Sequence, residues 1–412
     1  MIKRLSLTLL AVLSIVDSGH CQPATARIPR AQVQLAIWHD GTREDLKPVG
    51  TVTRLVQRDH SGLVLTIRVL PPETMLHQLK QWSSQDNAGL PDIVIVPDRW
   101  LPMFAHALQP LNALVDGRQL QCYPPSVRER LRHAGKLYGI PWITRSRALF
   151  YRPDLLQAAG VLPPKTWNDA LIAARRCHRP PDVYGFGLAG IRDDSGARMF
   201  LQMLWSLGGE LPVVGDPGRT NMAALEAALG LYRDLHGASE PEVLAWDQHS
   251  LEGFFEDGRV AMMVADSDFA EYLGAECGDL KWATAPLPAG PSAVGQIDVD
   301  AACILKTTRH LEASAKVLAS LLGSEQAEAR LALGGIPARS DLIDKHRLDP
   351  GYAAFIAGID RARGVPAERW DAAQAVISDA LFALLTGRQG VAETAQFIAT
   401  SLSGPAPVAP YE

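Results

Sequence analysis

Four consecutive apolar residues constrain the fold more than any other feature of this chain. Ile93, Val94, Ile95 and Val96 are apolar on both faces of any strand they form, as a central parallel strand must be when helices cover each side. The expected elements alternate before it: a strand at 33–38, a helix at 49–56, a strand at 63–70 and a helix at 76–82. This order predicts an α/β fold with a doubly wound sheet and right-handed crossovers.

The composition allows more than one core, because 47% of the 412 residues are hydrophobic and 21% are charged. The formal net charge is −5, so no basic excess exists to neutralise phosphates. We therefore expect no nucleic acid among the partners. The tail at 404–412, rich in proline and alanine, is expected to be loose.

The N-terminus has the pattern of a secretory signal peptide. Lys3 and Arg4 precede an apolar stretch at residues 5–16 that is too short to span a bilayer. Ala24 and Ala26 provide a small-residue cleavage site. The pattern predicts a signal peptide over residues 1–26 and a soluble, periplasmic mature chain, with a buried N-terminal helix as the alternative.

The cysteines leave two questions open. Cys21 ends a segment that resembles a lipoprotein box, but His20 is larger than the small residue such boxes need, which favours a free periplasmic protein over a lipid-anchored one. Four cysteines follow the leader: Cys122, Cys177, Cys277 and Cys303. Their pairing in an oxidising compartment stays open. None has zinc-site spacing, so neither a metal nor a cofactor is expected.

Helix boundaries are marked most clearly after residue 150. Pro153 and Gly160 delimit one helix, and Thr166 with Asp169 forms a capping box for the next. Two further helices are expected at 310–322 and 372–385.

Seven short motifs follow one another in a characteristic order. They are Leu-Pro-Asp-Ile-Val at 90–94, Lys-Leu-Tyr-Gly-Ile-Pro at 136–141, Ala-Leu-Phe-Tyr at 148–151, Gly160 with Pro-Lys-Thr-Trp at 164–167, Phe-Glu-Asp-Gly-Arg-Val-Ala-Met at 255–262, Pro-Leu-Pro at 286–288 and Gly-Gly-Ile-Pro-Ala-Arg at 334–339. In this order the chain resembles extracellular solute-binding proteins of the maltose-binding type, which serve sugar ABC importers. The resemblance covers nearly all of the mature chain.

The resemblance implies a two-lobed periplasmic-binding-protein fold of type II, the Venus flytrap. Two α/β lobes are joined by hinge strands and close over a ligand in the cleft between them. Mapped here, lobe one is residues 27–143 plus 297–345, and lobe two is 144–296 plus 346–412, with a helical C-terminal part. The expected crossings lie near 142–145 and 296–298.

In open parallel sheets, ligands bind beyond the carboxyl ends of the strands. The loops there provide most candidate ligand contacts: His39, Asp40, Arg43, Asp98, Arg99, Trp100, Trp142, Arg145, Asp266 and Asp268. The alternative for the charged residues is an exposed loop ion pair.

Sugars need charged planar groups for their hydroxyls and aromatic rings for their C–H faces. Asp98 and Arg99 resemble the pair that maltose-binding proteins place on glucose hydroxyls. The candidate stacking rings are Trp100, Trp142, Trp205 and Trp38, all of which could instead pack in the core. Arg339 is expected near the cleft mouth.

Two departures from the family pattern argue against maltose itself. Arg145 replaces a carboxylate, and Asp266 with Asp268 replaces a turn that carries a ring. Arg145 suits an acidic or phosphorylated sugar, whereas the aspartates suit hydroxyls or an amine. Alternatively, the two groups pair with each other across the cleft. Arg152 also stands where the family has an asparagine.

No enzymatic motif in the sequence has the context that its chemistry needs. The glycines at 185, 187 and 190 match GxGxxG, but a loop follows them rather than the helix that a nucleotide site needs. Asp193, Asp194, Glu240 and Glu242 look like solvated loop acids rather than a catalytic pair. We expect no catalytic residue.

The resulting hypothesis is a monomeric protein that binds a small carbohydrate-type solute in the interlobe cleft and delivers it to an ABC import permease. A binder of a sugar phosphate or glycerol phosphate is the alternative, motivated by Arg43, Arg99 and Arg145. A periplasmic ligand sensor and, less favoured, an exported hydrolase also remain open.

Overall fold

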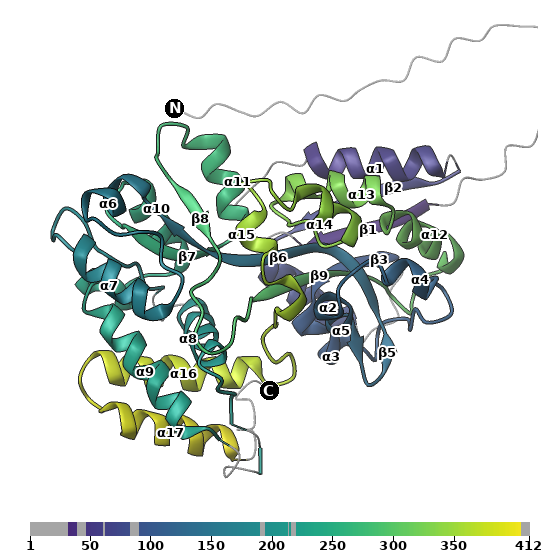
Figure 1. The fold of residues 1–412 in the computed structure, drawn as a ribbon. Coiled ribbons are helices and arrows are strands. Elements are labelled where there is room, and N and C mark those ends of the chain that lie inside the picture. Colours follow the sequence, from purple (N-terminus) through teal and green to yellow (C-terminus); the bar gives the residue numbers. More distant parts are fainter. Residues whose placement is uncertain are drawn as a thin grey trace, which may run out of the picture. The chain divides into compact units, whose positions relative to one another are not determined.

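A seven-stranded sheet organises the fold in the computed structural model (Figure 1). The structure describes residues 32–38, 47–60, 62–82, 90–189, 194–212, 214–215 and 220–404. The predicted signal peptide, Cys21 and the tail from residue 405 lie outside these residues. The strands are β1 (Gln32–Trp38), β2 (Val64–Leu70), β3 (Ile93–Pro97), β4 (Arg132–His133), β5 (Lys136–Leu137), β6 (Gly139–Tyr151), β7 (Met262–Asp266), β8 (Ala283–Ala285) and β9 (Ile297–Ile304).

The helices fall between and after these strands. In chain order they are α1 (Lys47–Asp59), α2 (Pro72–Trp82), η1 (Asp98–Trp100), α3 (Leu101–Phe104), α4 (Gly117–Leu120), α5 (Pro125–Arg130), α6 (Pro153–Ala158), α7 (Trp167–Cys177), α8 (Ser195–Ser206), α9 (Met222–His236), η3 (Pro241–Ala245), α10 (Gln248–Glu256), α11 (Ser267–Glu276), α12 (Leu311–Leu321), α13 (Ser324–Ala329), η4 (Leu331–Leu333), α14 (Ser340–His346), α15 (Ala353–Ile356), η5 (Ile359–Arg361), α16 (Trp370–Leu385) and α17 (Val391–Ser403).

The first hundred residues alternate strand and helix as predicted. Strand β1 pairs in parallel with both β2 and β3, and every residue of β3 is buried. The neighbour of β3 on its other side, however, is β9, and this pairing is antiparallel. The sheet is therefore mixed rather than wholly parallel, because β9 belongs to a segment that returns to the sheet from the opposite direction.

Strand β6 belongs to two groups of strands. It pairs with β9 from Gly139 to Ser146 and with β7 from Arg147 to Tyr151, and β8 also pairs with its second half. Figure 1 shows β6 running from the β1–β3 group to the β7–β8 group. The partner changes between Ser146 and Arg147, next to the crossing expected at 142–145.

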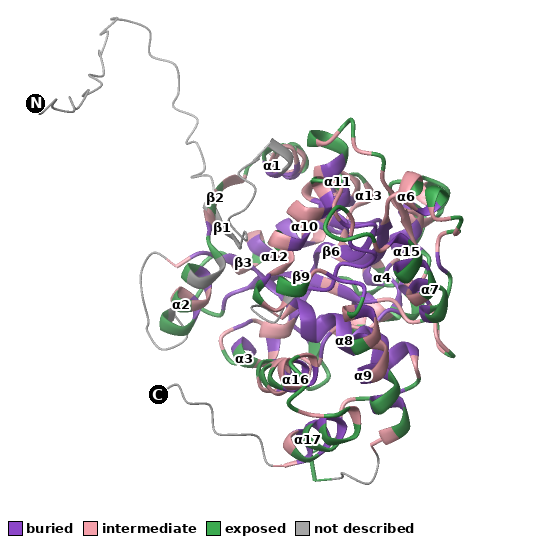
Figure 2. Cartoon of the chain, turned by 90° about the vertical axis from the view of Figure 1, so that its left-hand side faces the viewer, coloured by how far each residue is buried: buried purple, intermediate pink, exposed green. Residues whose placement is uncertain are grey.

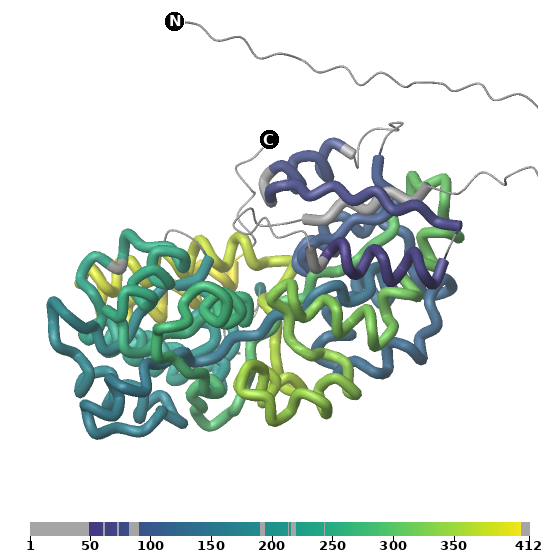
Figure 3. The backbone as a smooth tube through the Cα atoms, turned by 90° about the horizontal axis from the view of Figure 1, so that it is seen from above, coloured from purple at the N-terminus to yellow at the C-terminus, as the bar shows by residue number. Residues whose placement is uncertain are grey.

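Helices from distant parts of the chain pack together on the β7 side. The C-terminal helices α16 and α17 contact α8 and α9, and Figure 3 shows these yellow and teal segments together.

The predicted helix boundaries are confirmed where neighbouring residues in the sequence determine them. The capping box of Thr166 and Asp169 is present, and Gly160 follows α6 with φ +65°. The expected helices at 310–322 and 372–385 correspond to α12 and α16.

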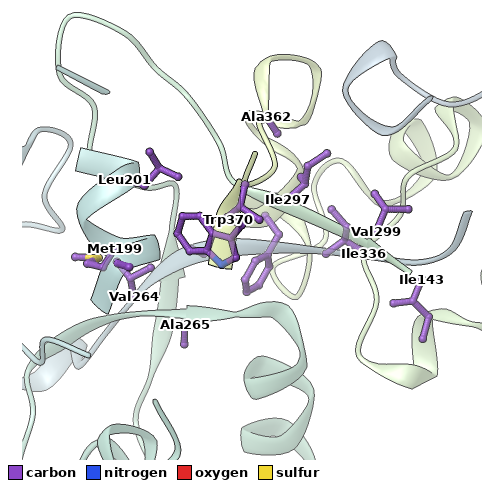
Figure 4. Packing of buried hydrophobic residues seen from close by; sticks show 14 of the residues in the cluster. Ile143, Met199, Leu201, Val264, Ala265, Ile297, Val299, Ile336, Ala362 and Trp370 are labelled. Atoms are coloured by element: carbon purple, nitrogen blue, oxygen red, sulfur yellow. The ribbon is translucent and has the colours of Figure 1, made fainter. Parts of the chain in front are cut away.

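The buried core follows β3, β6 and β9 (Figure 2). Near the crossing, apolar side chains from β9, β7, α8 and α16 face one another, among them Ile297, Val264, Met199 and Trp370 (Figure 4). Cys303 lies in this core, and it and the other three cysteines of the described chain are free thiols. No described helix combines the length and apolarity needed to cross a membrane.

Candidate functional site

Charged side chains alternate along the two central strands at the crossing. Arg145 and Arg147 are two residues apart on β6, so they share one face of the strand. Asp298 and Asp300 do the same on β9, and Arg145 lies opposite Asp298 in the register. Arg147 and Asp300 are each only 4% exposed. Charges buried to this degree require partners.

Both arginines of β6 have a carboxylate partner. Arg145 donates from Nη1 to Oδ2 of Asp300 over 2.7 Å. Arg147 donates from Nε to Oδ1 of Asp266 over 3.2 Å, which ties β6 to the last residue of β7. Arg145 and Asp266 are thus both ion-paired, but not with each other as the sequence allowed.

Arg198 connects helix α8 to β9. Its Nη1 and Nη2 donate to the two carboxylate oxygens of Asp298 over 2.6 and 3.0 Å, a bidentate geometry that strengthens an ion pair. Its Nε donates to Asp194 over 2.8 Å, and Asp194 also accepts from the indole Nε1 of Trp370 over 3.1 Å. The expectation of a solvated loop acid is wrong for Asp194, because that residue lies one turn before Arg198 at the start of α8.

Asp98 and Arg99 follow β3 directly. Asp98 is 2% exposed and accepts a hydrogen bond from Nε of Arg130 on α5. Burial raises the pKa of the Asp98 carboxyl, against the attraction of Arg130. Arg99 is half-buried and donates no hydrogen bond to any residue the structure describes, yet its charge acts on Asp98, Asp194 and Asp298.

These pairs influence one another electrostatically. Burial alone would raise the pKa of Asp298, but the attraction of Arg198, Arg99 and Arg147 outweighs it and holds that pKa well below its usual range. Arg198 and Arg99 also lower the pKa of Asp194. We call the following residues the ion-pair network: Asp98, Arg99, Arg130, Arg145, Arg147, Asp194, Arg198, Asp266, Asp298 and Asp300. Five guanidinium groups balance five carboxylates.

The sequence predicted four members of the network: Asp98, Arg99, Arg145 and Asp266. It missed Arg130, Arg147, Asp194, Arg198, Asp298 and Asp300. A signal for three of the missed residues, Arg147, Asp298 and Asp300, lies in the two strands. Arg-Ser-Arg at 145–147 and Asp-Val-Asp at 298–300 alternate charge within otherwise apolar runs, which an ordinary buried strand does not tolerate without partners.

Two of the predicted stacking rings are packed rather than open. Trp142 is 4% exposed, and the guanidinium of Arg330 lies 5.4 Å from its ring centre. Trp205 is 3% exposed, with Arg363 4.5 Å from its ring centre. We therefore leave both out of the candidate site. Trp100 is half-buried and packs edge-to-face on Phe104, with 6.4 Å between ring centres.

The remaining predicted contacts fall elsewhere or cannot be placed. Asp268 is half-buried in the first turn of α11, where Gly334 packs against it. Arg339 pairs with Asp341 over 2.9 Å and also donates to the carbonyl of Leu322, away from the ion-pair network. The following predicted residues lie outside the described part: His39, Asp40, Arg43 and the side chain of Trp38.

The glycines of the GxGxxG match have a packing role. A Cβ at Gly185 would lie 1.8 Å from the carbonyl oxygen of Ala174 on α7, and one at Gly187 would lie 2.4 Å from Leu251 on α10. Both positions need glycine because helices approach the backbone closely, independently of any nucleotide. Within the described ranges, no group of three or more His, Cys, Asp or Glu residues could hold a metal ion.

A family model described as bacterial extracellular solute-binding protein matches residues 65–329. A Brucella abortus protein named only as a binding protein is 28% identical over 356 residues, which are 82% of this chain and 84% of the relative.

Two solved structures share the architecture. The maltose-bound MalE3 of T. maritima has a TM-score of 0.76 and 22% identity, covering 90% of this chain and 99% of that one. An ABC transporter solute-binding protein of Thermotoga lettingae, bound with α-D-tagatose, has a TM-score of 0.75 and 19% identity, covering 90% and 98%. These likenesses show a fold of two α/β lobes joined by hinge strands around an interlobe cleft.

Proposed function

The chain belongs to the family of bacterial extracellular solute-binding proteins, and we propose that it binds a small neutral carbohydrate in its interlobe cleft and delivers it unchanged to an ABC import permease. The observation that favours an uncharged ligand is that five guanidinium groups balance five carboxylates in the ion-pair network. A neutral guest leaves this balance intact, whereas a charged one adds an uncompensated charge in a poorly solvated place.

The network also has the chemistry that sugars require. Carboxylates accept and guanidinium groups donate charge-assisted hydrogen bonds in fixed planes, which matches the hydroxyls around a pyranose or furanose ring. The similar structures bound with maltose and α-D-tagatose support this class of ligand. Trp100 is the described ring that we propose for the apolar face of the sugar.

Exposure divides the network into contacts and supports. We propose Arg99 and four partly exposed members as direct contacts. The exposed fractions of their side chains are 22% for Arg145, 33% for Asp194, 26% for Asp266 and 19% for Asp298. The side chains of Asp98 and Arg147 are only 2% and 3% exposed. These two, we propose, orient the groups around them.

A phosphorylated ligand is less well supported. A phosphate needs guanidinium donors that are free to turn toward it. Arg130, Arg145, Arg147 and Arg198 each already donate to a carboxylate, which leaves Arg99 among the network's described arginines. One such donor gives a weak basis for binding a dianion.

The geometry of the ion-pair network gives little support for hydrolysis of a sugar ligand. A glycosidase needs one carboxylic acid that can donate a proton to the leaving oxygen. Asp98 has a raised pKa, but it is 2% exposed and engaged by Arg130, so it cannot reach a glycosidic bond. Arginine holds the pKa of Asp298 and Asp194 low, so both remain ionised. Ligand recovered unchanged after long incubation is the expected result.

We propose the lobe boundaries as residues 27–143 plus 297–345 for lobe one and 144–296 plus 346–412 for lobe two, with β6 and the start of β9 as crossings. Ligand in the cleft shifts an open–closed equilibrium, and the closed form is the one presented to the permease. The family supports an extracellular, hence periplasmic, place of action.

A thermal-shift panel tests this function. Neutral mono- and oligosaccharides, sugar acids and sugar phosphates are added separately, and a compound that binds only the native state raises the melting temperature. We expect neutral sugars to raise it. A shift with sugar phosphates or glycerol phosphates alone would contradict the neutral-sugar proposal, and loss of the ligand into products would contradict the transport role.

A further inference from the structure

A small cavity lies beside β6 just before the crossing. It measures about 20 Å³, and the residues that matter here are Tyr123, Thr144, Arg330 and Arg339. Thr144 and Arg145 are neighbours on β6, so their side chains point to opposite faces of the strand, and the cavity faces away from the ion-pair network. It is therefore separate from the proposed sugar site.

Arg330 places a buried charge at this cavity without an opposite charge. The side chain is 4% exposed, donates from Nε to the carbonyl of Trp142 over 2.5 Å and from Nη2 to that of Pro141 over 3.4 Å. Its Nη1 has no hydrogen-bond partner, and no carboxylate forms an ion pair with it among the residues the structure describes. Arginine stays protonated in proteins, so the site carries an uncompensated positive charge.

Two hydroxyl groups at the same cavity are also unsatisfied. The Tyr123 and Thr144 residues are each 3% exposed, and neither hydroxyl proton has an acceptor in the described part of the chain. An unpaired buried polar group costs free energy, so three such groups around one cavity indicate a missing partner. All three can donate a hydrogen bond. The nearby guanidinium of Arg339 adds positive potential.

We propose that this cavity binds one monatomic anion, of the size and charge of chloride. A volume of about 20 Å³ admits a single particle of roughly the size of water, which excludes sulfate and phosphate. A water molecule would satisfy some of the donors but would not offset the charge of Arg330. A halide accepts hydrogen bonds from Arg330, Tyr123 and Thr144 and neutralises the guanidinium.

Bromide provides a direct test by crystallography. Crystals grown in sodium bromide should show an anomalous peak between Arg330, Tyr123 and Thr144. A water-like peak without anomalous signal at that place would overturn the proposal.

A solution measurement separates the anion from general salt effects. Raising sodium chloride from about 10 to about 300 mM should raise the melting temperature of the wild type by roughly 2 °C more than sodium gluconate of equal ionic strength. Thr144→Val and Arg330→Met should lose this difference, while Arg54→Met, at an exposed position on α1, should keep it. If Arg330→Met does not fold, Thr144→Val still decides. Equal responses of the wild type to both salts would contradict the site.

Discussion

At the residue scale, the members of the ion-pair network differ most in how much of their hydrogen-bonding capacity is already used. Arg198 donates to two carboxylates and Arg147 to one, whereas Arg99 donates to no described residue. A ligand can therefore gain a new charge-assisted bond from Arg99 without breaking an existing one. On this basis we propose Arg99 as a ligand contact and Arg147 as a residue that supports the site.

Arg99→Gln should weaken binding of the neutral sugar found by the thermal-shift panel by roughly 10- to 100-fold, because a charge-assisted hydrogen bond is lost. The ligand-free variant should unfold at a somewhat lower denaturant concentration than the wild type, since Arg99 also attracts Asp98, Asp194 and Asp298. The affinities are therefore compared under conditions in which both proteins are folded. Calorimetric titration measures the affinity. The Arg54→Gln variant, altered on the exposed face of α1, serves as control, and an unchanged affinity for Arg99→Gln would remove this residue from the site.

Asp298→Asn should lower the free energy of unfolding by about 3 kcal/mol, because Arg198, 7% exposed, keeps its charge while losing its bidentate partner. Urea denaturation measures the change. The matched control is Glu325→Gln, which makes the same chemical change in an ion pair whose members are both more than half exposed, and no measurable loss is expected there. Equal effects for the two variants would mean that Asp298 is not buried against Arg198.

The ion pair of Asp298 with Arg198 should also make the free energy of unfolding depend on pH. The folded-state pKa of Asp298 is lowered relative to an ordinary unfolded value of about 3.9, so its contribution is complete above about pH 5 and is lost as the pH falls through the folded-state pKa. The difference in unfolding free energy between wild type and Asp298→Asn should therefore shrink below about pH 4. Denaturation across a pH series measures it, and a difference that grew in acid would contradict the assignment.

At the scale of elements, sequence patterns predicted what local chemistry determines. The apolar run of β3, the capping box of α7 and the glycine after α6 all depend on neighbours within a few residues. The antiparallel place of β9 beside β3 depends on a pairing about two hundred residues apart, which no local pattern encodes. The pairing of Arg147 with Asp266 and of Arg198 with Asp298 is hidden from the sequence for the same reason, because each pair joins segments about a hundred residues apart.

The residues of the candidate site also differ in whether local sequence or long-range packing determines their position. The position of Asp98 and Arg99 at the end of β3 could be predicted because they directly follow a recognisable strand. The burial of Trp142 and Trp205 could not be predicted, because a tryptophan in the sequence looks the same whether its ring is open or covered by an arginine from a distant segment. Residue type indicates the available chemistry, and only long-range packing determines which face of a ring remains free.

Close pairing of β6 with β9 predicts a position where side-chain size is critical. A Cβ at Gly139 would lie 2.8 Å from Cβ of Ala301 and 3.0 Å from Sγ of Cys303, so Gly139→Ala should destabilise the protein by about 1–3 kcal/mol. Gly230→Ala on α9 is the matched control, because nothing lies within 4 Å of its Cβ, and it should stabilise the helix by up to about 1 kcal/mol. Urea denaturation compares the two. A neutral Gly139→Ala would show that the two strands are not packed this closely.

At the scale of the whole molecule, β6 takes part in both groups of strands. A strand shared in this way lets the groups move relative to each other through small changes in a few dihedral angles, while the ion-pair network lies across the same place. Binding of the sugar at the network, as we propose, would couple occupancy to the relative position of the lobes, and the permease would recognise that position.

Small-angle X-ray scattering of the mature chain, with and without a saturating neutral sugar chosen from the thermal-shift panel, tests this account most directly. Closure of two lobes around the sugar predicts a smaller radius of gyration in the saturated sample than in the free one, at unchanged molecular mass. An unchanged radius of gyration at full saturation would contradict a hinged capture mechanism.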